Sequence, residues 1–140
     1  MLFRSDAGFS AAAAVLGGLL PGLRLVVGGR SAGARSACRT ASDLEAVGCV
    51  ALAFPLHPPG RPEDSRLPEL VSSGVPTLVV QGANDPFGRP EEFPELPVAH
   101  RLVVMPGADH GLKVGARATP DQDAVLAMVA AAVGDFVVGL

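Results

Sequence analysis

The sequence predicts an α/β fold in which a parallel sheet of about four strands is flanked by helices. Four short apolar segments have the composition of strands buried on both faces, at 23–28, 49–54, 77–81 and 101–105. Helical patterns separate these segments, which favours right-handed β-α-β units. The 140 residues fit a single domain, spanning 1–140.

Each predicted helix has a local signal. An alanine-rich segment at 10–20 ends at a Pro-Gly pair, and apolar residues recur at helical spacing over 34–44. Two short helices fit at about 67–72 and 90–96.

The last helix, predicted over 120–138, has the clearest start. Thr119 is the expected N-cap, Pro120 suits the first helical position, and Gln122 completes a capping box.

Composition excludes several functional classes. The net charge is -3, and no Trp or Tyr is present, so the chain lacks the basic patch and stacking surface of nucleic-acid-binding proteins. Two cysteines, Cys38 and Cys49, are too few for a disulfide scaffold or a zinc site, and we expect both to be reduced core residues. No apolar run is long enough to span a membrane and no signal peptide is evident, so we expect a cytoplasmic protein without metal or organic cofactor.

The first candidate for chemistry lies between the strand at 23–28 and the helix that follows it. Gly29-Arg30-Ser31-Ala32-Gly33 forms the pattern G-x-S-x-G in the strand-to-helix context that this motif requires. Small neighbours allow a sharp turn that exposes the Ser31 hydroxyl, and the Ala32 N–H at the helix start can donate to an oxyanion. The alternative is a glycine-rich turn with an N-capping serine.

Two further reactive residues follow the third and fourth strands. Asp85 lies in Gly-Ala-Asn-Asp-Pro-Phe-Gly, and His110 lies in Gly-Ala-Asp-His-Gly. Because parallel strands bring their carboxyl ends to one edge of the sheet, Ser31, His110 and Asp85 can meet as nucleophile, base and orienting acid. Asp109 is the poorer acid candidate and is expected to pin its loop through backbone hydrogen bonds.

Two residues have open interpretations. Arg30 can meet an acidic group of a substrate or a carboxylate of the fold itself. His57, on the loop after the second strand, can line a substrate pocket or belong to a rigid surface loop. Competing motifs fail, because Ala34 replaces the lysine of a P-loop and no acid follows the second strand as a dinucleotide site requires.

The stretches GGRSAGARSA, FPLHPPGRPE, QGANDPFG and MPGADHGL, in this order, resemble the catalytic half of an α/β hydrolase. They are similar to a family of small bacterial hydrolases related to dienelactone hydrolase. The same family includes the domain of testis-expressed hydrolase-like proteins and of a subunit of the non-specific-lethal chromatin complex. The resemblance begins at about residue 22 and implies Ser31 as nucleophile, Asp85 as orienting acid and His110 as base.

The resemblance also implies a missing part. The family has about four strands before the serine strand, and a loop among them supplies a second oxyanion N–H. The chain is therefore expected to be a truncated version of a longer protein, to work with a partner, or to have lost activity.

We expect the chain to hydrolyse an ester or related acyl bond in a small acyl substrate. Only about a dozen residues separate the second strand from the next helix, so no sizeable lid is expected. The alternative is a non-catalytic α/β-hydrolase-like interaction module or an inactive fragment. The strand Leu23–Gly28 would become a sheet edge of largely apolar composition, so we expect dimerisation or aggregation through it.

Overall fold

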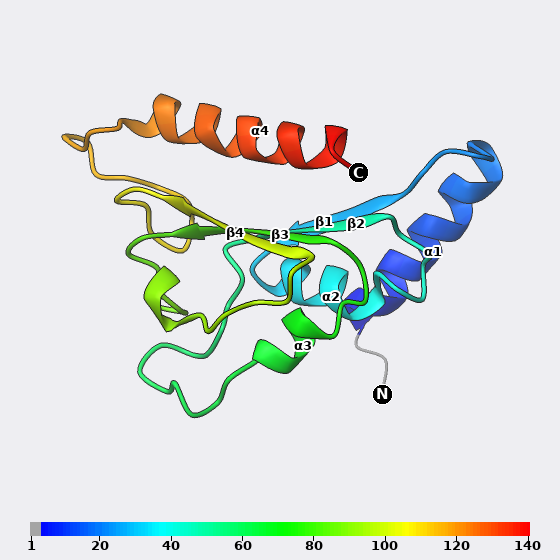
Figure 1. Ribbon diagram of the computed structural model, residues 1–140, viewed down its shortest axis with the longest axis horizontal. Helices are drawn as coiled ribbons and strands as arrows, with labels where there is room; N and C mark the ends of the chain where they lie inside the picture. Colours follow the sequence, from blue (N-terminus) through cyan, green and yellow to red (C-terminus); the bar gives the residue numbers. More distant parts are fainter. Residues whose placement is uncertain (1–3) are drawn as a thin grey trace.

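The computed structural model describes residues 4–140, and it contains one sheet of four parallel strands in the order β1-β2-β3-β4. The strands are β1 (Val26–Arg30), β2 (Gly48–Leu52), β3 (Thr77–Gly82) and β4 (His100–Met105). The helices are α1 (Arg4–Leu19), α2 (Ala32–Thr40), α3 (Leu67–Val71) and α4 (Gln122–Val138). Helix α4 covers one face of the sheet, whereas α2 and α3 lie on the other, with α1 packed beside α2 (Figure 1). The α/β class and the parallel four-strand sheet are confirmed.

The sheet has an apolar core on each face, and the inner strands β2 and β3 contribute side chains to both cores. In β2, Cys49 and Ala51 pack into the core below α2, while Val50 between them packs into the core below α4. All six residues of β3 are buried, whereas the outer strands β1 and β4 alternate with exposed positions. The sequence predicted strands buried on both faces; β3 fits this prediction fully, whereas β1 and β4 are partly exposed at the two edges of the sheet.

The first strand lies further along the chain than predicted. It runs from Val26 to Arg30 rather than over 23–28, because Gly28 and Gly29 pair in register with β2. The glycines that signalled a turn are therefore strand residues, and the turn itself begins at Ser31.

The predicted start of the last helix is wrong by two residues. Helix α4 begins at Gln122, and its N-cap is Asp121, whose carboxylate accepts a 2.9 Å hydrogen bond from the Ala124 N–H. Thr119 lies outside the helix, and the Gln122 side chain bonds the backbone of the loop 112–114. A carboxylate at the positive end of the helix dipole is the stronger of the two competing caps.

Two helix predictions differ in length for physical reasons. The segment predicted as a helix over 90–96 forms only the 3₁₀ turn η1 (Pro90–Glu92), because Pro94 and Pro97 interrupt it. Helix α1 begins at Arg4 instead of residue 10, and its first turn is held by Asp6, which accepts hydrogen bonds of 2.7 and 2.9 Å from Arg39 of α2.

Residues 4–140 contain the helices α1, α2, α3 and α4 described above. None of them combines the length and the apolar content that crossing a bilayer requires.

Candidate active site

The chain makes a strained turn where β1 meets α2. Ser31 has φ 53° and ψ −117°, a backbone conformation that residues with a side chain rarely adopt. The turn is tight enough that a Cβ on Gly29 would lie 2.4 Å from the carbonyl carbon of Gly33. The Ser31 N–H donates to the Leu52 carbonyl of β2 at 3.0 Å, which ties the turn to the sheet.

The hydroxyl of Ser31 is one end of a hydrogen-bonded chain of three side chains. Its Oγ lies 2.8 Å from His110 Nε2, and His110 Nδ1 lies 2.8 and 3.0 Å from the two carboxylate oxygens of Asp85. Since a carboxylate only accepts, Nδ1 donates to Asp85, and in the neutral ring Nε2 is left to accept from Ser31. The structure thus brings together the three residues that the sequence placed after three separate strands.

Asp85 is fully buried, and its oxygens have donors besides His110. Oδ1 accepts from the Phe87 N–H at 2.8 Å, and Oδ2 accepts from Gln81 Nε2 at 3.0 Å. A buried carboxylate needs such donors, because burial without them carries a large desolvation cost. Sequence analysis missed Gln81, although a polar residue at the end of an otherwise apolar strand is the signal that could have found it.

The loop that carries His110 is held by its neighbour. Asp109 Oδ1 accepts from the N–H groups of Gly111 and Lys113, at 2.8 and 3.0 Å. The prediction that Asp109 pins this loop through backbone hydrogen bonds is confirmed, and the carboxylate in contact with His110 is that of Asp85.

The N–H of Ala32 is the first of helix α2. It donates no hydrogen bond to any of residues 4–140. A free N–H at a helix start, next to Ser31, suits an anionic oxygen.

Arg30 and His57 occupy different surroundings. Arg30 is exposed and donates to the His110 carbonyl at 3.4 Å. Its guanidinium therefore lies beside the hydrogen-bonded side chains of Ser31, His110 and Asp85. His57 is buried, and both of its ring nitrogens are hydrogen-bonded within the protein, to the Pro58 carbonyl and to the Glu92 carboxylate. This placement favours the rigid-loop interpretation of His57 over contact with a substrate.

The two cysteines are core residues, as predicted. Their Sγ atoms lie 3.9 Å apart, and both thiols are free and buried. The neighbouring Cys49 thiol and burial raise the pKa of Cys38 far above its usual range, which disfavours a thiolate nucleophile there. Across residues 4–140, no group of three or more His, Cys, Asp or Glu side chains has the arrangement of a metal site.

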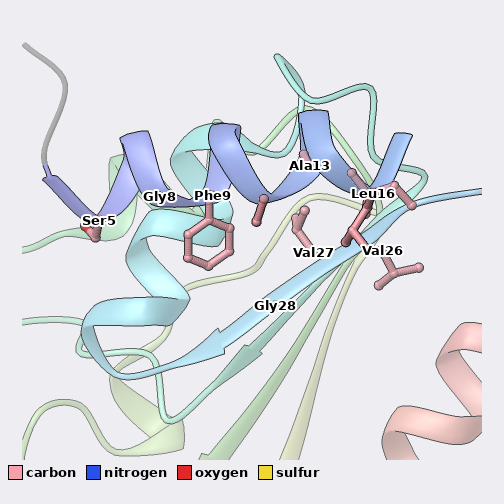
Figure 2. A pocket seen from close by; sticks show the side chains of 10 residues that line it. Ser5, Gly8, Phe9, Ala13, Leu16, Val26, Val27 and Gly28 are labelled. Atoms are coloured by element: carbon pink, nitrogen blue, oxygen red, sulfur yellow. The ribbon is translucent and has the colours of Figure 1, made fainter. Parts of the chain in front are cut away.

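An apolar groove of about 520 Å³ lies between α1 and β1, apart from the hydrogen-bonded chain. Figure 2 shows Phe9 and Leu16 of α1 lining it together with Val26 and Val27 of β1. Ser31, Asp85 and His110 do not line this groove.

The sequence from residue 8 to residue 138 matches the family model described as alpha/beta hydrolase domain. This chain belongs to the alpha/beta hydrolase domain family. A comparison with curated proteins gives no match.

Solved structures with the same fold come from several bacteria. An α/β serine hydrolase of Xanthomonas campestris, described as lacking a lid, aligns over 97% of this chain and 60% of its own, with a TM-score of 0.66 and 22% identity. An α/β serine hydrolase homologue of Coxiella burnetii aligns over 79% and 53%, with a TM-score of 0.61 and 19% identity. The esterase domain of a Rhodothermus marinus protein aligns over 76% and 59%, with a TM-score of 0.60 and 16% identity. The chain therefore spans between about half and three fifths of the structures that it matches.

Proposed function

We propose that this α/β hydrolase domain cleaves an ester or a related acyl bond through an acyl-enzyme intermediate on Ser31. The observation that supports the proposal is the continuous hydrogen-bonded chain, 2.8 Å from Ser31 Oγ to His110 Nε2 and 2.8 Å from His110 Nδ1 to Asp85 Oδ2. Hydrolases that share the fold, from Xanthomonas and Coxiella, lend the proposal further support.

In the first half of the reaction, Ser31 Oγ attacks the acyl carbon while its proton passes to His110 Nε2. Asp85 accepts the Nδ1–H, fixes the tautomer and stabilises the imidazolium. The oxyanion of the tetrahedral intermediate accepts from the Ala32 N–H. Its collapse breaks the bond to the leaving group, which takes the proton from Nε2.

In the second half, water takes the place of the leaving group. His110 Nε2 accepts a proton from the water as its oxygen attacks the acyl carbon, and the proton then returns to Ser31 when the acid is released. No metal or organic cofactor takes part in these steps.

We propose a small or flexible acyl group as substrate, with Arg30 as the residue placed to contact an acidic substituent. The basis is the exposed Arg30 guanidinium beside His110 and the short segment between β2 and α3. Among residues 4–140, the Ala32 N–H is the donor that we propose for the oxyanion, and loss of a second such donor typically lowers turnover about 10²–10³-fold. Slow turnover is therefore the expected behaviour of this chain alone.

A fluorophosphonate probe tests the proposal, because only an activated serine reacts with it. We expect labelling of the wild-type chain and of Ser10→Ala, an exposed serine of α1 that serves as the control, and no labelling of Ser31→Ala. Hydrolysis of p-nitrophenyl acetate should follow the same pattern. A folded wild-type chain that neither labels nor turns over substrate would instead favour a non-catalytic interaction module.

A further inference from the structure

The imidazole of His110 contacts an aromatic ring in addition to its hydrogen-bond partners Ser31 and Asp85. The ring of Phe87 stacks on it, with 4.1 Å between the ring centroids and 27° between the ring planes. Phe87 lies only two residues after Asp85, so the same short segment supplies both the carboxylate partner and a flat surface for the histidine.

The backbone of Phe87 is held on both sides. Its N–H donates to Asp85 Oδ1 at 2.8 Å, and its carbonyl accepts from the His57 N–H at 3.0 Å. The next residue is fixed as well, since the Gly88 carbonyl accepts from Gln81 Nε2 at 2.8 Å. Gly88 has φ 142°, and a Cβ there would lie 2.6 Å from the Cβ of Leu56, so the segment packs closely against the loop after β2.

That loop is fastened in turn by the His57 ring. Nδ1 lies 2.8 Å from the Pro58 carbonyl and Nε2 lies 2.7 Å from Glu92 Oε2, so both nitrogens face acceptors. A neutral ring has one N–H and can satisfy only one of them, whereas the imidazolium satisfies both. The Pro58 carbonyl chiefly, and Glu92, raise the pKa of His57 against the opposing effects of burial and of Arg66.

We propose that Phe87 is a positioning residue for His110, with His57 and Glu92 anchoring the segment that presents its ring. This inference rests on the proposed function. The stacked ring restricts rotation of the imidazole, which keeps Nε2 directed at Ser31 and Nδ1 at Asp85. It also stabilises the imidazolium that forms when His110 takes the Ser31 proton, because a cation over an aromatic face is attracted to the negative face of the ring.

Three variants of the full chain test this role. Phe87→Leu removes the aromatic face, Phe87→Tyr retains it, and Phe93→Leu removes a buried phenylalanine that packs in the core on the α2 side. We expect Phe87→Leu to lower kcat about tenfold with KM within twofold of wild type, because the ring acts on the charged state of His110 more than on substrate binding. Phe87→Tyr should recover most of the loss, and Phe93→Leu should lower the denaturation midpoint while leaving the pH profile of kcat/KM in place.

A second measurement does not depend on turnover. The Nδ1–H of His110, which donates to Asp85, can be followed by NMR; it should exchange with water faster in Phe87→Leu and at close to the wild-type rate in Phe87→Tyr, because the stacked ring restricts movement of the imidazole. Equal kcat and equal exchange rates of the His110 Nδ1–H in wild type and Phe87→Leu would overturn the inference, as would a Tyr variant as impaired as the Leu variant. If the wild-type chain neither labels nor turns over substrate, the proposed function fails, and the NMR comparison still decides whether Phe87 acts on His110.

Discussion

The two glycines of the G-x-S-x-G motif have different roles in the structure, and exchanging each for alanine separates them. A Cβ on Gly29 would lie 2.4 Å from the Gly33 carbonyl carbon and 2.6 Å from its oxygen, whereas a Cβ on Gly33 would meet nothing within 4 Å. The G-x-S-x-G motif requires glycine at both positions, whereas the structure requires it only at Gly29. Comparing Gly29→Ala with Gly33→Ala therefore tests the structure and not the motif.

The expected magnitudes follow from these distances. Ordinary contact begins near 3.4 Å, so Gly29→Ala must move the backbone beside Ser31 by about 1 Å. Overpacking of this kind costs about 2–3 kcal/mol of unfolding free energy, and a displacement of about 1 Å at a reacting group lowers the rate about 10²-fold. Gly33 lies in the first turn of α2, where alanine should be neutral or stabilise by up to about 1 kcal/mol.

Guanidinium unfolding of both variants gives the stability change, and the rate of fluorophosphonate labelling gives the effect on Ser31. We expect Gly29→Ala to be destabilised and to label slowly, and Gly33→Ala to resemble the wild type in both measurements. A Gly29→Ala chain within about 0.5 kcal/mol of wild type with normal labelling would refute the argument from the tight turn. Equal damage by both substitutions would refute the distinction between the two glycines.

Three further predictions concern strain, charge and the sheet edge. Because Ser31 has a positive φ, Ser31→Gly should unfold with a free energy about 1 kcal/mol higher than Ser31→Ala, and neither variant should label; equal stabilities would contradict the strain. Since the pKa of His57 is raised above its usual value near 6.5, the stability that its ion pair with Glu92 contributes is complete below pH 6.5 and is lost as pH rises through the raised pKa. Guanidinium midpoints of wild type should therefore fall with rising pH more steeply than those of Glu92→Gln, and parallel curves would contradict this. Finally, β1 is an edge of the sheet with an apolar groove beside it, so sedimentation of the purified chain should show dimers or larger species. Leu16→Lys, which places a charge in the groove, should reduce these species. A monodisperse wild-type monomer would contradict pairing through this edge.

The sheet and the proximity of Ser31, Asp85 and His110 were predictable from the sequence for one shared reason. Buried parallel strands produce apolar runs, and the carboxyl ends of such strands gather at one edge. Placing Ser31, Asp85 and His110 after three separate strands was therefore sufficient to expect them to meet.

What the sequence did not predict depends on contacts between distant segments. Phe87 stacks on His110, which lies on a different loop, and no local sequence pattern contains that contact. The first turn of α1 likewise depends on Asp6 meeting Arg39 of another helix. The start of α4 was mistaken because two cap signals stand two residues apart, and only the structure shows which carboxylate or hydroxyl the free N–H groups reach.

The proposed chemistry has two requirements, alignment of the three side chains and stabilisation of the oxyanion, and they depend on different parts of the fold. The alignment of nucleophile, base and acid depends on the loops after β1, β3 and β4, and every hydrogen bond in that alignment lies within this chain. Oxyanion stabilisation depends on donors aimed at a point beside Ser31, where the described residues contribute the Ala32 N–H. A serine can thus be well aligned while its transition state is poorly stabilised, since alignment and electrostatic stabilisation are separate contributions to the rate. Substitutions that disturb alignment, such as Gly29→Ala or Phe87→Leu, should therefore lower the proposed turnover independently of the oxyanion contribution.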